Sequence, residues 1–181
     1  GDGDGFFPPD DCNDNDPNVY PGAPDEAGDG IDQNCDGIDG TLDAIFVKSS
    51  GGADNSTCGT VSSPCASINQ GQVRAVATGK TDVYVAGGTY PKFNVVEGLQ
   101  IVGGYGQNWQ RGLNATAPTV SNVNASFDAL TNGPVAMIAD GIDSPTRVAD
   151  LKLNGGTAGV GQTSYTAFVR NSTDALVLDS L

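Results

Sequence analysis

The stretch DVYVAGGTYPKFNVVEGLQIVGGY, residues 82–105, contains three short apolar runs separated by glycine, proline and asparagine. Short alternating or β-branched runs predict strands, and the residues between them are typical of turns. One similar run, AIFV, precedes this stretch at residues 44–47, and others begin near residues 119, 135, 148, 166 and 175. The chain is therefore expected to be all-β from residue 44 onward.

One segment has a helical pattern instead. Residues 65–79, CASINQGQVRAVATG, place Ile68, Ala75 and Val76 on one face, and Gly79 is a suitable helix stop. Gly71 weakens this pattern because glycine lowers helix propensity. The predicted helix lies just before the main series of strands.

Many short strands fit either a β-sandwich or a solenoid of stacked turns. The apolar runs recur at steps of about 15 to 25 residues, which suits a solenoid, and the helix would cap its exposed core. We therefore expect residues 44–181 to form a right-handed parallel β-helix with one N-terminal capping helix. The final run, ALVLDSL, lies inside an expected strand, so further turns or another subunit are expected to cover that end.

A resemblance supports this architecture. The segment GGTYPKFNVVEGLQIVGGYGQNWQR, residues 87–111, resembles the opening turns of bacterial secreted β-helix proteins. CGTVSSPCASI, residues 58–68, resembles the cysteine-bearing segment that precedes them. The resemblance covers about residues 44–111 and implies a fold, but little about function.

The first 43 residues form a separate, strongly acidic segment. They contain thirteen of the 22 acidic residues and none of the eight Lys and Arg, so nearly all of the net charge of −14 lies there. Such a segment has too few apolar residues to order itself, and its charge requires solvent or counter-cations. Nucleic acid is excluded as a partner because its phosphates would be repelled. No apolar run approaches the length of a membrane span.

The segment ends in DQNCDGIDGTLD, residues 32–43, which has the spacing of an EF-type calcium loop. Side chains at places one, three and five, a carbonyl at seven and an acid at twelve surround the ion in such a loop, and glycine at six permits the sharp turn. Gly37 occupies place six. The expected ligands are Asp32, Asn34, Asp36, the Ile38 carbonyl and Asp43.

Two less complete groups of oxygen ligands precede this loop. The first lies in DGDGFFPPDD, residues 2–11, and lacks place one; its ligands would be Asp2, Asp4, the Phe6 carbonyl and Asp11. The second has irregular spacing and comprises Asp11, Asn13, Asn15, Asp16, Glu26 and Asp29. We expect two or more Ca²⁺ ions, and the alternative is a solvated acidic linker.

The four cysteines fall into two local groups, which predicts the disulfides Cys12–Cys35 and Cys58–Cys65 and an oxidising compartment. Free thiols are the alternative, and zinc is disfavoured because the chain has no histidine and no CxxC spacing. Four Asn-X-Ser/Thr sequons indicate glycosylation, although a surface rich in Ser, Thr and Asn also makes them by accident. They begin at Asn55, Asn114, Asn124 and Asn171.

Residues 1–43 closely resemble the acidic metal-binding motif of the MopE type, and more loosely thrombospondin type 3 repeats. The matching text is GDGDGFFPPDDCNDNDPNVYPGAPDEAGDGIDQNCDGIDG. The family's usual cysteine before DG is Gly28 here, which leaves Cys12 and Cys35 as the segment's one pair. The resemblance implies an extracellular, calcium-stabilised module of bacterial surface proteins. The family name mentions copper, but a chain with no histidine and only Met137 favours calcium.

The sequence provides little evidence of catalysis. Charged residues crowd residues 140–152, but such a group is more typical of a solvated turn and outward strand positions, and no nucleophile motif or phosphate loop accompanies it. Trp109 is expected to pack in the fold rather than bind sugar. The charged group comprises Asp140, Asp143, Arg147, Asp150 and Lys152.

These observations predict a non-enzymatic, extracellular structural glycoprotein with two domains, residues 1–43 and 44–181. We expect a subunit of a surface layer, fibre or filament that forms homo-oligomers and has glycans as further partners. The alternative is the N-terminal part of a carbohydrate-active or carbohydrate-binding β-helix protein, and a weaker one is a calcium-responsive linker. The absence of an initiator Met and a signal peptide predicts a mature or excised segment.

Overall fold

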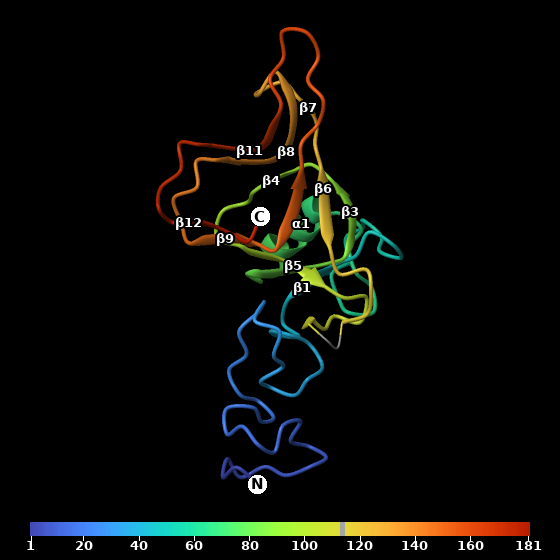
Figure 1. The fold of residues 1–181 in the computed structure, drawn as a ribbon, viewed down its shortest axis with the longest axis vertical. Helices are drawn as coiled ribbons and strands as arrows, with labels where there is room; N and C mark the ends of the chain where they lie inside the picture. The colour runs from blue at the N-terminus through green and yellow to red at the C-terminus, as the bar shows by residue number, and fades with distance from the viewer. Residues whose placement is uncertain (113–114) are drawn as a thin grey trace.

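The computed structural model describes residues 1–112 and 115–181. Residues 1–44 contain neither helix nor strand and extend away from a body of parallel strands (Figure 1). The largest of the three sheets in that body is entirely parallel, in the order β1-β2-β5-β9-β12. Its members are β1 (Ile45–Val47), β2 (Asp82–Ala86), β5 (Gln100–Tyr105), β9 (Thr146–Ala149) and β12 (Leu176–Asp179).

The second and third sheets contain the strands that follow β2, β5 and β9 along the chain. The second sheet pairs β3 (Gly88–Pro91), β6 (Ser121–Asn124) and β10 (Leu151–Asn154) in parallel. The third pairs β4 (Phe93–Asn94), β8 (Gly133–Asp140) and β11 (Tyr165–Arg170) in parallel, and β7 (Ser126–Asp128) joins β8 antiparallel.

The prediction of a right-handed parallel β-helix is wrong. The chain is mostly β and mostly parallel, but its strands lie in separate sheets of five, three and four strands with one antiparallel member. A regular solenoid requires each turn to supply a strand to every sheet. Here β4 has only two residues, and the described part of residues 106–120 contains no strand.

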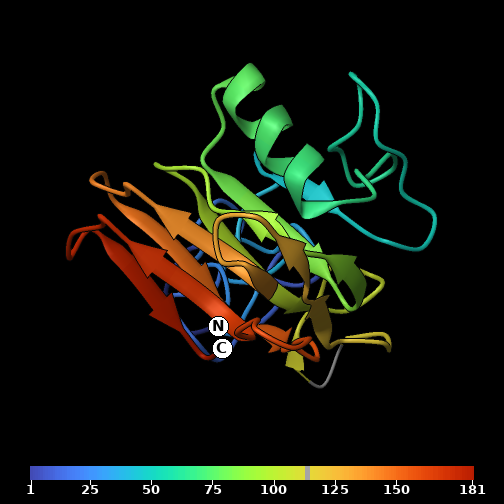
Figure 2. The same ribbon diagram turned by 90° about the horizontal axis from the view of Figure 1, so that it is seen from above.

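The single helix, α1 (Ile68–Thr78), packs against β1, β2 and β4. Ser67 caps its N-terminus, and Gly79, the stop that the sequence predicts, ends it in the left-handed conformation. Figure 2 shows α1 at one end of the stack of strands, with the C-terminal strands at the other. Val76 does not share the buried face, because it is 61% exposed. Gly71 does, since a Cβ there would lie 2.4 Å from Val47 Cγ2.

Both faces of the first sheet are buried over most of β1, β2 and β5, whereas β12 is largely exposed. The inward residues, such as Ile45, Val83 and Ile101, join the core shared by the three sheets and α1. The outward residues form a second cluster beneath the acidic segment, which we call the aromatic face. It comprises Phe46, Tyr84, Ala86, Val102, Tyr105 and Trp109, and it packs against Ala27, Ile38 and Ala44.

Candidate metal centre

The acidic segment is held together by the predicted Cys12–Cys35 disulfide, whose Cα atoms lie 5.6 Å apart. Its few buried apolar side chains include Val19, Ala23 and Ile38. So small an apolar content gives little hydrophobic stabilisation to so many like charges. The positions of the carboxylates therefore decide what else can order the segment.

Three predicted ligands at the N-terminal end come together. Oxygens of Asp2, Asp4 and Asp11 all lie within 4.8 Å of one another. Tight turns orient them: Asp2 Oδ1 accepts the Asp4 N–H at 3.3 Å, Asp4 Oδ1 accepts the Phe6 N–H at 2.8 Å, and Asp11 Oδ1 accepts the Asn13 N–H at 2.8 Å. We call these three residues the first carboxylate cluster.

The second oxygen of each residue in this cluster is shielded from solvent. Oδ2 of Asp2, Asp4 and Asp11 is buried and accepts no hydrogen bond, and Asp11 as a whole is only 4% exposed. Shielded carboxylate oxygens without donors are costly unless a cation neutralises them. The cluster therefore fits a bound cation, because it brings carboxylate oxygens from three residues close together.

Hydrogen bonds join the first six residues of the predicted EF-type loop into a turn. Asp32 accepts the N–H groups of Asp36 at 3.1 Å and Gly37 at 2.8 Å, and Asn34 Oδ1 accepts the Asp36 N–H at 2.9 Å. Gly37 makes the turn at φ 91°. Burial, followed by the nearby charge of Asp32, raises the pKa of Asp36. We call residues 32–40 the second loop.

Asp43, the expected ligand at place twelve, points elsewhere. Its carboxylate lies 3.3 Å from Lys80 Nζ, and its side chain is 86% exposed. Lys80 also donates to the Ala44 carbonyl at 3.0 Å. The turn into β1 and the lysine that follows α1 thus hold Asp43 outside the second loop.

Asp25 and Gln33 are candidate ligands that the sequence analysis missed. Both oxygens of Asp25 and Oε1 of Gln33 are buried and accept no well-formed hydrogen bond. Desolvation is the main cause that raises the pKa of Asp25 to about 7, and Asp32 and Asp39 add to it. The MopE-type phrase has an acid just after PGA, and this was the one signal that could have found Asp25.

Asp14 was also missed. Its Oδ2 accepts from the Gly1 amine at 2.9 Å, and its Oδ1 is buried without a partner.

The remaining predicted ligands lie outside the first carboxylate cluster, and some of them accept hydrogen bonds from the segment. Asp29 accepts the Ile31 N–H at 2.8 Å and the Gln33 side-chain amide at 2.6 Å, and Asp16 accepts from Asn18. Glu26 is exposed and lines an open cavity with Asp25 and Gln33. Asn13 and Asn15 are exposed, Phe6 stacks on Tyr20 at 5.5 Å, and Ile38 is buried.

Asp39 has a structural position. It is 2% exposed and accepts the Gly28 N–H at 2.6 Å and the Gly30 N–H at 2.7 Å. Arg111 lies 3.5 Å away. Burial raises the Asp39 pKa, and the two hydrogen bonds and Arg111 oppose that effect. This carboxylate ties the two halves of the acidic segment to each other and to the body.

Residues 11–40 match the family Cu-binding MopE, described as a "Putative metal-binding motif". No curated protein and no solved structure matches the chain. The match covers the candidate ligands from Asp11 to Ile38, and the first carboxylate cluster extends beyond it to Asp2. A match to a metal-binding motif of the MopE type is therefore present in residues 11–40, and Asp11 is the residue that this match shares with the first carboxylate cluster.

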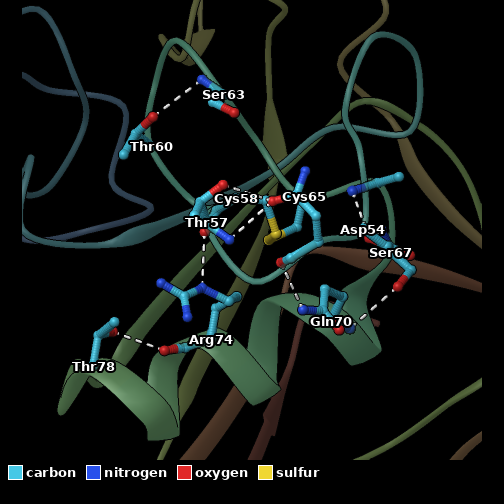
Figure 3. The surroundings of a disulfide bond; sticks show 12 residues. Asp54, Thr57, Cys58, Thr60, Ser63, Cys65, Ser67, Gln70, Arg74 and Thr78 are labelled. Carbon is cyan, nitrogen blue, oxygen red and sulfur yellow. Dashed lines mark hydrogen bonds between the residues drawn. A yellow bond between two sulfur atoms is a disulfide. The ribbon is translucent and has the colours of Figure 1, made fainter.

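Outside the MopE motif, the second predicted disulfide, Cys58–Cys65, closes the loop before α1 (Figure 3). Arg74 Nε donates to the Cys58 carbonyl at 3.1 Å, and Asp54 Oδ1 accepts the Ser67 N–H at 3.0 Å. This loop also covers β1, because the Cys65 N–H donates to the Phe46 carbonyl at 2.9 Å.

The three described sequons differ in their surroundings. Asn55, Asn124 and Asn171 are exposed, whereas Asn114 lies outside the described residues. Asn55 Oδ1 accepts the Thr57 N–H at 2.9 Å and the Thr57 hydroxyl at 3.0 Å. The amide of Asn171 donates to Asp140 at 3.0 Å.

The charged residues between 140 and 152 do not form one site. Asp140 pairs with Arg170 at 2.7 Å, Asp150 with Arg111 at 2.9 Å, and Arg147 lies 3.5 Å from Asp179. Trp109 is 4% exposed and packs against Phe46. In the part of the chain that the structure describes, no helix is long and apolar enough to span a bilayer.

Proposed function

We propose that this chain is a calcium-stabilised structural protein of the extracellular space or cell surface, a glycoprotein subunit of a layer, fibre or filament. The observation on which the proposal rests is the first carboxylate cluster, which gathers carboxylate oxygens of three residues within 4.8 Å of one another and leaves the Oδ2 atom of each buried without a donor. A cation that binds only the ordered segment stabilises that form by mass action.

The ligand chemistry favours calcium over copper. The candidate ligands are carboxylate, amide and carbonyl oxygens, which suit a hard cation. The chain has no histidine, its one methionine, Met137, is fully buried, and all four cysteines are in disulfides. Bound calcium would supply positive charge and a fixed coordination shell, and the chain supplies the turns that orient the carboxylates.

Two disulfides and exposed sequons support an extracellular location and glycan attachment, because disulfides persist in oxidising compartments. Assembly is supported by the sheet edges. Within the described residues, β10, β11 and β12 each pair with a named strand on one side only. Such edges accept further strands. A homo-oligomer that grows through these edges would form a layer or filament. The proposal assigns a catalytic role to no residue.

Isothermal titration of the chelated protein with Ca²⁺, together with native mass spectrometry, tests the metal assignment. We expect two or more calcium ions per chain and no displacement by an equal concentration of Cu²⁺. Copper binding with no calcium binding would contradict the assignment. Electron microscopy with and without EGTA tests assembly, and monomers in both conditions would contradict the filament.

A further inference from the structure

The second loop carries candidate ligands of the predicted EF-type loop and also contacts the aromatic face. Asp32, Asn34 and Asp36 are its candidate ligand side chains. Only two residues later, the Ile38 side chain is 4% exposed and packs with Phe46, Tyr84 and the rest of the aromatic face. Ligand positions and apolar cover therefore lie on one short piece of chain.

Hydrogen bonds join this piece of chain to the sheet. The Tyr105 hydroxyl donates to the Asp39 carbonyl at 2.7 Å, and the Thr41 N–H donates to the Tyr84 hydroxyl at 3.1 Å. Gly40 makes this close approach possible, since a Cβ there would lie 2.3 Å from the Tyr84 hydroxyl. The contact is small and specific, so it depends on the shape of the loop.

Without a cation, electrostatics would oppose this contact. The acidic segment has thirteen acids and no basic residue. Both oxygens of Asp25, and Oε1 of Gln33 within the second loop, are shielded from solvent without a hydrogen-bond donor. The buried side chains that cover the aromatic face are few and small: Ala27, Ile38 and Ala44. Their burial against the aromatic rings favours the closed contact, and repulsion among acids that no cation neutralises opposes it.

We propose that cation binding at the second loop holds the acidic segment on the aromatic face, so that removal of the cation uncovers this face. The inference rests on the proposed calcium binding and adds its consequence for the body of the protein. The bound cation then stabilises the contact between the acidic segment and the body. The local calcium concentration decides whether solvent reaches Phe46, Tyr84, Tyr105 and Trp109.

The single tryptophan of the chain reports on this contact directly. Trp109 is 4% exposed, and its ring lies 4.9 Å from that of Phe46 within the aromatic face. Addition of EGTA to the intact protein should move its emission to longer wavelength and increase quenching by acrylamide, and added Ca²⁺ should reverse both. An unchanged emission while titration calorimetry shows calcium binding would overturn this inference and leave the proposed function intact. Absence of calcium binding would overturn both.

Two matched variants identify the loop responsible. Asp36→Ala and Asp4→Ala each remove one carboxylate, from the second loop and the first carboxylate cluster respectively. We expect Asp36→Ala to raise the Ca²⁺ concentration at the midpoint of the Trp109 signal about tenfold or more, equivalent to ~1.4 kcal/mol. Asp4→Ala should leave that midpoint in place. Equal shifts in both variants would overturn the assignment to the second loop.

A third variant tests the contact itself without touching a ligand. Tyr105→Phe removes the hydrogen bond to the Asp39 carbonyl, and we expect greater acrylamide quenching of Trp109 at a given subsaturating Ca²⁺ concentration. Tyr165→Phe, on β11 away from this face, is the control. If acrylamide quenched Trp109 equally in the two variants, the proposed stabilisation of this contact by the cation would be contradicted.

Discussion

Asp11 is the most buried residue of the first carboxylate cluster. Its Oδ2 is buried without a donor in a residue that is 4% exposed, beside Asp2 and Asp4. Asp11→Asn removes one negative ligand but keeps an oxygen that can accept the Asn13 N–H. We expect calcium affinity to fall about tenfold or more, ~1.4 kcal/mol, by titration calorimetry. The calcium-free protein should unfold at the same temperature or higher, because repulsion decreases.

The neighbouring residue provides the control for this substitution. Asp10 is exposed and lies next to Asp11 in the sequence. Asp10→Asn changes the net charge by the same amount, so it should alter calcium affinity far less. A similar loss in both variants would mean that only the overall charge of the segment matters and that the cluster is not a ligand set.

The ligand spacing predicted part of this site because it is local. Asp2, Asp4 and Asp11 fit one EF-type register, and the structure brings their oxygens together. Asp25 and Gln33 could not be found by spacing, since their burial depends on how the chain returns after Pro24. Asp43 fits the register but meets Lys80, a residue 37 positions away that the loop pattern does not include.

At the scale of elements, α1 replaces a missing strand next to β4. The Gln72 amide donates to the Asn94 carbonyl at 2.9 Å, and its oxygen accepts the Val96 N–H at 2.8 Å. Gln72 is 1% exposed, so Gln72→Leu would leave both backbone groups buried and unpaired. We expect the free energy of unfolding to fall by about 2–4 kcal/mol in urea denaturation.

Gln70→Leu on the same helix is the matched control. Gln70 donates one hydrogen bond, at 3.0 Å, to the exposed Asn55 carbonyl. Its loss should change the free energy of unfolding by less than about 1 kcal/mol, because water can replace the protein partner. Equal losses for the two variants would contradict a strand-like role for Gln72.

An ion pair connects Lys92, between β3 and β4, with Asp128 in β7, and it makes the free energy of unfolding depend on pH. Lys92 Nζ donates to Asp128 Oδ2 and is the main cause that holds the pKa of Asp128 below its usual value of 3.8. A lowered folded pKa contributes stability above the unfolded pKa and loses it as the pH falls through the folded pKa. Asp128→Asn should therefore lower the free energy of unfolding at neutral pH by less than about 1 kcal/mol.

Below the usual Asp pKa this difference should decrease, and it should disappear once the pH is below the lowered pKa of folded Asp128. Urea denaturation of both proteins in EGTA at about pH 7 and about pH 3 measures it. Asp143→Asn is a suitable control, since Asp143 is exposed on a turn. A difference between wild type and Asp128→Asn that stays constant over this range would rule out the ion pair as its source.

The elements themselves were predicted to different extents for a physical reason. The C-terminal end of the helix was found because Gly79 acts locally, whereas the N-cap at Ser67 was not identified and the helix begins three residues after the expected start. Most strands were found from their apolar runs, but β7 was not, since Ser126–Asp128 is short and polar. The pairing of strands into separate sheets joins residues far apart, such as Leu151 with Ser121, and no local pattern specifies it.

On the scale of the whole molecule, the first sheet is where the acidic segment and the body meet. Alternation in IFV and DVYVA predicts one inward and one solvent-facing set of side chains. The structure buries both sets, because the acidic segment covers Phe46, Tyr84 and Tyr105. Aromatic residues at outward positions were the available signal, and the charge of residues 1–43 obscured it by suggesting a solvated linker.

The Cys12–Cys35 disulfide should determine how strongly the whole molecule holds calcium. It links residues 23 positions apart around the candidate ligands, and removal of such a cross-link costs about 3 kcal/mol of chain entropy. If cations order this segment, the free energy of calcium binding has to compensate for that entropy cost. Cys12→Ser combined with Cys35→Ser should therefore weaken calcium binding roughly a hundredfold by calorimetry.

The Cys58–Cys65 bridge closes a loop beside α1 and β1, outside the acidic segment. Its double serine variant should keep the calcium affinity while it lowers the melting temperature of the body. If the two double variants lost calcium affinity equally, the disulfide would act through general stability and the acidic segment would not be the part that calcium orders.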